Sequence, residues 1–166
     1  MLSYDKSINL TFLGVVMVTA KKFNIFHSEQ SWVGPLLRVP AGVIFIAHGA
    51  QKLFAAFGGY GLEGTGQYMA SLGLEPGYWM ALMAGSAEFF GGIALLIGLL
   101  VRPAALVLAV TMLVAIVTVH LANGLFLSNG GYEFGLALLA ICMSLSVQGG
   151  GRLALDNYLA KRSWWR

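Results

Sequence analysis

The sequence predicts an all-α integral membrane protein, and its composition and four long apolar runs are the observations that support this fold class. Of the 166 residues, 58% are hydrophobic and only 10% are charged, and the mean hydropathy is +0.77. A soluble domain usually has about 25% charged residues, so a water-soluble fold could not bury this much apolar surface. The length allows one domain, in which four membrane spans of about 20 residues would use roughly half of the chain.

Four apolar runs have the composition of membrane spans, and together they predict a four-helix bundle. The predicted spans cover residues 36–57, 78–101, 104–122 and 132–147. The fourth span is the shortest, and Gly131 and Gln148 could extend it at its two ends.

The first connection is long, whereas the other two are short. Residues 58–77 are rich in glycine, and residues 64–72 within them are expected to form a short amphipathic helix in the first outer loop. The apolar contacts of this helix would be Tyr68, Met69 and Leu72.

Spans two and three are joined only by an Arg102-Pro103 turn, in which proline suits the first turn of the following helix. Residues 123–131 form the last connection, and their Asn-Gly-Gly sequence at 129–131 indicates a turn.

The N-terminal residues 8–20 are apolar but too short for a span, and Lys21 and Lys22 follow them directly. In a signal peptide the basic residues precede the apolar run, so these residues are expected to be an interfacial or disordered extension, with a short fifth span as the alternative. The predicted organisation is therefore an extension at 1–31, a transmembrane domain at 32–156, and a basic, Trp-containing cytoplasmic tail at 157–166.

Lysine and arginine predict the orientation. With both termini in the cytoplasm, nine of the ten basic residues lie on the cytoplasmic side, and only Lys52 lies elsewhere. Arg38 and Arg102 are then expected to be topology anchors, and Trp164 and Trp165 an anchor at the cytoplasmic interface. The nine cytoplasmic residues are Lys6, Lys21, Lys22, Arg38, Arg102, Arg152, Lys161, Arg162 and Arg166.

In this orientation five ionisable residues on four helices share the outer side of the membrane. They are His48, Lys52, Glu88, His120 and Glu133. Glu88 would lie roughly 15 Å below the outer surface, and His48 and Lys52 are four residues apart on one helix face. Asn123 follows His120 at a spacing of three and could extend the same polar edge.

A charged side chain that faces lipid costs several kcal/mol, so these groups should face the bundle interior and pair with one another. Lys52 is expected to pair with Glu88 or Glu133. Gly85 and Gly92 on either side of Glu88 would let a neighbouring helix approach closely. The alternative is structural, because helix-end residues are partly hydrated and a buried carboxyl or imidazole often serves only as an interhelical hydrogen-bonding group.

The sequence points to no metal, haem or nucleic-acid site. His48, Glu88, His120 and Glu133 are suitable ligand types for a metal, but nothing in their spacing selects one. The basic residues have no stacking aromatics between them, so nucleic-acid binding is not predicted. Cys142 is the only cysteine, which excludes a disulfide or redox pair within one chain.

Several segments follow one another in a fixed order over about residues 32–156. They are Arg38, residues 48–54 (HGAQKLF), 88–92 (EFFGG), 98–105 (GLLVRPAA), His120 with 123–124 (NG), and 130–133 (GGYE). This ordered set resembles the DoxX family of small bacterial membrane proteins. The resemblance implies a four-helix protein of the bacterial plasma membrane, related to the DoxD subunit of archaeal thiosulfate:quinone oxidoreductase. It also implies a link to membrane-associated redox complexes.

Two functions from different classes follow. The first is a redox-associated subunit whose polar cluster binds a quinone or similar head group. In it His48, Lys52 and Asn123 bind the ligand, and Lys52, Glu88, His120 and Glu133 serve as acid, base and hydrogen-bonding groups. Electrons would then come from a redox partner protein or a diffusible donor, and a homo-oligomer is compatible with the sequence. The second is a non-catalytic membrane scaffold or a small-solute transporter.

Overall fold

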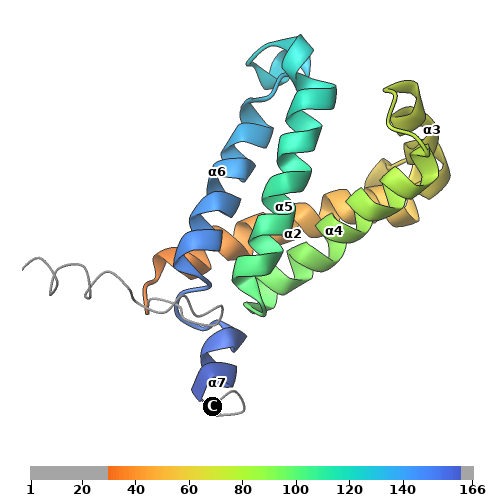
Figure 1. Ribbon diagram of the computed structural model, residues 1–166. Helices are drawn as coiled ribbons and strands as arrows, with labels where there is room; N and C mark the ends of the chain where they lie inside the picture. The colour runs from red at the N-terminus through yellow and green to blue at the C-terminus, as the bar shows by residue number, and fades with distance from the viewer. Residues whose placement is uncertain (1–29, 162–166) are drawn as a thin grey trace, which may run out of the picture.

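The computed structural model of the protein describes residues 30–161, which form helices and connecting loops with no strand among them (Figure 1). The all-α prediction is therefore confirmed. The predictions for the apolar residues 8–20, for the basic residues near the two termini and for Trp164 and Trp165 fall outside the described residues.

Six α-helices are described, and four of them are long and apolar. The helices are α2 (Val33–Phe54), α3 (Gly61–Ser71), α4 (Gly77–Ile97), α5 (Val101–Ala115), α6 (Glu133–Gln148) and α7 (Leu155–Lys161). A π-helix at Ile116–His120 and a 3-10 turn at Leu121–Asn123 continue α5, and further 3-10 turns lie at Ala56–Gly58 and Leu127–Asn129.

Within the described part of the chain, three segments are long and apolar enough to cross a membrane. They are Val33–Phe54, Gly77–Ile97 and Val101–Asn123, while Glu133–Gln148 is a shorter apolar helix. Each coincides with one predicted span to within about four residues at either end. The short helix α3 starts three residues before the predicted position, and α7 crosses the predicted domain boundary between residues 156 and 157.

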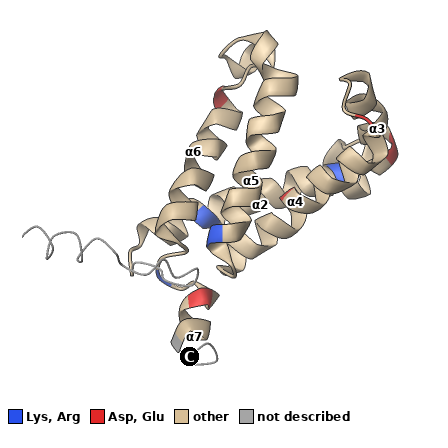
Figure 2. Ribbon diagram, viewed as in Figure 1, with Lys and Arg blue, Asp and Glu red and all other residues tan. Residues whose placement is uncertain are grey.

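The four long helices form two pairs that diverge from a common vertex (Figure 1). Helix α2 packs along α4, and α5 packs along α6, while α3 covers the far end of the α2–α4 pair. Figure 2 shows how few charges the α5–α6 pair has, since its helices contain only Arg102 and Glu133, each in a first turn. The buried core lies where the pairs meet and contains Ala41, Phe45, Leu95, Val101, Ala105, Leu108, Ala109, Met112, Leu138, Cys142 and Leu145.

Glycines let α2 and α4 approach until their backbones touch. A Cβ atom added at Gly92 would lie 2.8 Å from the carbonyl oxygen of Gly42 and 2.8 Å from the amide nitrogen of Ile46. A Cβ atom at Gly49 would overlap the backbone of Phe89. Because lipid supplies no hydrophobic drive for helix association, this close packing stabilises the pair. The predicted role of Gly92 as a contact for a neighbouring helix is confirmed.

The first prediction concerns this contact. Gly92→Val should destabilise the protein by about 1–3 kcal/mol, because the added side chain meets backbone atoms that cannot move aside without separating the helices. Unfolding in mixed micelles, followed by the helical circular dichroism signal, measures the change. Ala137→Val is the matched control, since Ala137 is exposed on α6. Equal stability of the two variants would contradict the proposed packing role.

The connection between α4 and α5 differs from the predicted Arg102-Pro103 turn. Both residues lie inside the first turn of α5, and the chain reverses at residues 98–100. Gly98 has a φ of 75° and closes α4, where its amide and that of Leu99 donate to the carbonyl of Ala94. Glycine adopts this left-handed conformation without a steric penalty, which explains why α4 ends before the proline rather than at it.

Candidate functional site

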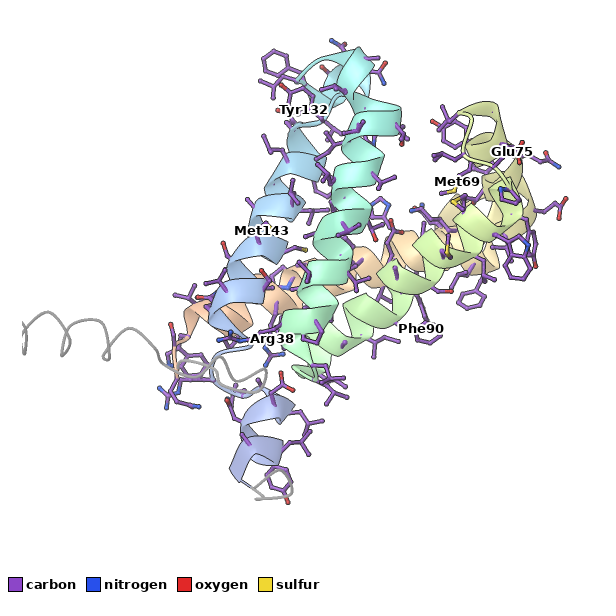
Figure 3. The ribbon with its side chains drawn as sticks, viewed as in Figure 1. Arg38, Met69, Glu75, Phe90, Tyr132 and Met143 are labelled. Atoms are coloured by element: carbon purple, nitrogen blue, oxygen red, sulfur yellow. The ribbon has the colours of Figure 1, made fainter. Side chains whose placement is uncertain are left out.

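A cleft of about 740 Å³ lies between the two helix pairs. Its size is typical of small-molecule sites, and its walls come from α2, α3, α4, α5 and α6. Most of its lining is apolar, and the three predicted apolar contacts contribute to it, Tyr68 and Met69 from α3 and Leu72 directly after that helix. Figure 3 shows Met69 near the α3–α4 end, while Phe90 points away from the cleft on the other side of α4.

The strongest polar interaction of the cleft joins α2 to α4. The ammonium Nζ of Lys52 lies 2.6 Å from Oε2 of Glu88, and the side chain of Glu88 is only 4% exposed. Gly85 makes this geometry feasible, because its missing side chain leaves room for the stem of Lys52 one turn before Glu88. Of the two predicted pairings of Lys52, the one with Glu88 is thus confirmed.

His48 lies one helical turn before Lys52 and faces α6 across the cleft. Its ring centroid is 6.3 Å from that of Phe134, with 42° between the ring planes. Both residues line the cleft. Phe134 was not predicted as a site residue, because the sequence does not distinguish an aromatic residue that lines a cleft from one that faces lipid.

His120 reaches the cleft from the π-helix that continues α5. Its Nδ1 lies 2.7 Å from the carbonyl oxygen of Gly130, and since a carbonyl only accepts, Nδ1 is the protonated nitrogen. Nε2 of the neutral ring is then an acceptor, with no hydrogen-bond partner among the described residues. Such π-turns are frequent at functional sites because they change which side chain faces inward.

Glu133 begins α6 and Asn123 ends the 3-10 turn that continues α5, and neither residue lines the cleft. The carboxylate of Glu133 accepts a hydrogen bond of 2.6 Å from the amide of Leu127. The side-chain amide of Asn123 donates to the carbonyl of Val119 at 3.2 Å. Of the six predicted site residues, the structure therefore brings His48, Lys52, Glu88 and His120 to one cleft and places the other two outside it, at the two ends of the α5–α6 connection.

Arg38 at the vertex is buried, which corrects its interpretation as only a topology anchor. Its side chain is 3% exposed, and its guanidinium donates to five backbone carbonyls at 2.6–3.5 Å (Figure 3). Two of these carbonyls end α4, where a positive charge also complements the helix dipole. Five donors thus meet five acceptors, namely the carbonyls of Leu95, Leu96, Gly150, Arg152 and Leu153.

Asp156 is a second buried charge at the vertex that was not predicted. Its carboxylate accepts hydrogen bonds of 2.7 Å and 3.0 Å from the amides of Leu100 and Val101 at the start of α5. Burial raises the pKa of Asp156 above its ordinary value, while the two amides and the charge of Arg38 oppose this shift. A lone aspartate next to a glycine run gives no sequence signal for such a role.

The fold and the cleft together define a helical membrane protein with a cavity of ligand size. The sequence model of the DoxX family matches residues 35–121, which is more than half of the chain. "Putative oxidoreductase CatD" of Bacillus subtilis is 36% identical over 126 residues, covering 76% of this chain and 86% of the relative. "Inner membrane protein YqjF" of Escherichia coli is 34% identical over 137 residues, covering 78% and 95%. The chain therefore belongs to the DoxX family, whereas no solved structure gives a significant match.

Proposed function

We propose that this protein is a membrane-embedded subunit of a redox system and that its cleft binds the head group of a quinone. The observation that supports this function best is the ion pair of Lys52 and Glu88 in the wall of a mostly apolar cleft. Ionisable groups within membrane segments are costly and are usually retained for ligand or proton handling. The name of the Bacillus subtilis relative, "Putative oxidoreductase CatD", is consistent with this proposal.

The proposed topology has four spans in a bacterial plasma membrane, with both termini in the cytoplasm. Helix α6 has 16 residues and a length of about 24 Å, and it packs along α5, which lets it serve as the fourth span despite its length. The basic residues of the chain support the orientation. The polar residues of the cleft then lie toward the outer leaflet, where a quinone dissolved in the bilayer can enter from the side.

The side chains of the cleft have distinct proposed roles. The ammonium of Lys52 has three donors, of which one is used by Glu88 and one by the carbonyl of His48, so the third is free to bind a quinone oxygen. His120 faces the cleft from the other helix pair and exchanges a proton at Nε2. Glu88 orients the ammonium of Lys52. Reduction of a quinone takes up two electrons and two protons, and the electrons come from a partner protein or a diffusible donor.

The test removes the ammonium of Lys52, which is the proposed hydrogen-bond donor to the quinone oxygen. In lipid nanodiscs, Lys52→Met should weaken binding of a short-chain ubiquinone or menaquinone analogue at least tenfold, because a hydrogen bond from a charged donor contributes about 1.5–3 kcal/mol. Equilibrium dialysis measures the dissociation constant, and circular dichroism checks the helical content of each variant.

Arg152→Met is the matched control, since it also replaces a cation but lies outside the cleft, where Arg152 stacks on Trp32. This control should bind the analogues as the unmodified protein does. Unmodified protein that is folded and binds neither analogue would contradict the proposal and favour the alternative of a scaffold or a small-solute transporter.

A further inference from the structure

We infer that His48 and Phe134 form a ring clamp that selects a planar head group, in which the quinone ring lies between the imidazole and the phenyl ring. This inference rests on the proposed function and adds to it the part of the cleft that holds the ring. The ring clamp is defined by these two residues, which come from α2 and α6 and approach each other across the cleft.

The two rings form an aromatic pair whose centroid spacing is slightly shorter than one inserted ring needs. Stacked carbon atoms are separated by about 3.5 Å, so a ring between two others needs about 7 Å between the outer rings. The present centroid distance is 6.3 Å, with the planes inclined by 42°. Insertion therefore requires the two rings to move apart and to rotate to parallel. Phe134 is 38% exposed, which leaves room for this rotation.

The position of the ring clamp also suits the polar groups of the cleft. Nζ of Lys52 donates to the carbonyl oxygen of His48 at 3.5 Å, and both side chains line the cleft from successive turns of α2. A ring held at His48 is therefore expected to lie on the same wall as the ammonium of Lys52. On the other wall, Phe134 is placed by the close approach of α5 and α6. A Cβ atom added at its neighbour Gly135 would lie 3.0 Å from Cγ1 of Ile116.

The chemistry of the clamp distinguishes planar rings from other amphiphiles. A quinone ring is flat and electron-poor, and it stacks well on the electron-rich face of a phenyl ring. A saturated ring of the same size is thicker, and a phospholipid has no ring at all. The clamp would therefore exclude the abundant lipids of the bilayer and admit quinones.

The experiment compares two ligands that share two ring carbonyls and the chain, one with a planar conjugated ring and the other with a saturated ring. A short-chain ubiquinone and a cyclohexane-1,4-dione with the same chain are titrated against nanodisc-embedded protein by equilibrium dialysis. The unmodified protein should prefer the quinone at least tenfold. Phe134→Leu should reduce this preference to about threefold or less, while Phe134→Tyr should keep it. Phe126→Leu is the matched control, because Phe126 is 63% exposed in the α5–α6 loop and does not line the cleft.

A fluorescence measurement supplies an independent result if Phe134→Leu alters folding. In a variant whose four native tryptophans are replaced by phenylalanine, Phe134→Trp should be quenched by the quinone at the concentration that half-saturates the site. Phe90→Trp, on the side of α4 away from the cleft (Figure 3), reports quenching by quinone dissolved in the lipid. Saturable quenching only at position 134 supports the clamp.

A failure of the proposed function and a failure of the ring clamp give different results. If the unmodified protein binds no quinone, the proposed function itself fails, and the clamp with it. If it binds quinone while Phe134→Leu keeps the full preference for the planar ligand, the clamp is wrong and the proposed function stands. Equal quenching of Trp at positions 134 and 90 would likewise overturn the clamp alone.

Discussion

Arg38→Met is expected to abolish stable folding of the protein in lipid bilayers. The substitution keeps a long apolar stem but removes the guanidinium that joins α2, the end of α4 and the segment after α6. The buried carbonyls then lose their partners, and each unsatisfied group costs about 1–3 kcal/mol. Even a few of them would offset most of a total stability of about 5–15 kcal/mol. Protease resistance and the helical circular dichroism signal of purified protein measure the effect.

Two further variants separate the bonding geometry of Arg38 from its charge. Arg38→Lys keeps the charge but offers three donors instead of five, so it should fold with a stability between that of the unmodified protein and Arg38→Met. Arg152→Met is the matched control on an exposed arginine and should lose at most about 1 kcal/mol. Arg38→Met protein as stable as this control would show that the five carbonyls find other partners.

The fold could be predicted from the sequence because the membrane-spanning signal is one of composition and length. The spans at 78–101 and 132–147 coincide with α4 and α6 to within four residues, since long apolar runs exclude other structures. The divergence of the two helix pairs could not be predicted, because the angle at which two helices cross depends on which of their small residues come into contact. The α4–α5 turn was misplaced because a single glycine, Gly98, ends α4 earlier than the proline indicates.

The candidate site was predictable only in part, because the sequence indicates that a buried charge needs a partner but does not show a partner that is a backbone group. Lys52 and Glu88 were predicted to pair because an unpaired charge in lipid is too costly, and this rule does not depend on detailed geometry. Arg38 and Asp156 obey the same rule with backbone partners, which leave no trace in the sequence. Phe134 was missed because aromatic residues are common in spans. Its proximity to His48 arises only when the helices pack together, so the sequence alone does not show it.

The vertex and the cleft therefore use buried charge in opposite ways. At the vertex, the carboxylate of Asp156 and all five donors of Arg38 are paired with backbone groups, and nothing remains to bind a ligand. In the cleft, Lys52 keeps a free donor beside its partner Glu88. Spare hydrogen-bonding capacity in an apolar cavity is the feature that a binding site requires and that a purely structural ion pair lacks.

A double-mutant cycle on Lys52 and Glu88 should separate the structural from the functional use of this pair. Lys52→Met alone leaves a buried carboxylate without its partner and should destabilise the protein by about 3–5 kcal/mol. The double variant Lys52→Met/Glu88→Leu removes both charges and should recover most of this loss, because well-packed apolar residues often replace a buried ion pair without cost. Unfolding in mixed micelles measures all four proteins of the cycle.

The same double variant should not recover quinone binding, since the donor to the ligand oxygen is gone although the helices pack as before. Its dissociation constant for the short-chain ubiquinone should stay at least tenfold above that of the unmodified protein. A folded double variant with unchanged affinity would show that the pair serves only to join α2 to α4. Stability that returns while binding does not is the combination that only a functional pair predicts, because a structural pair has no second role to lose.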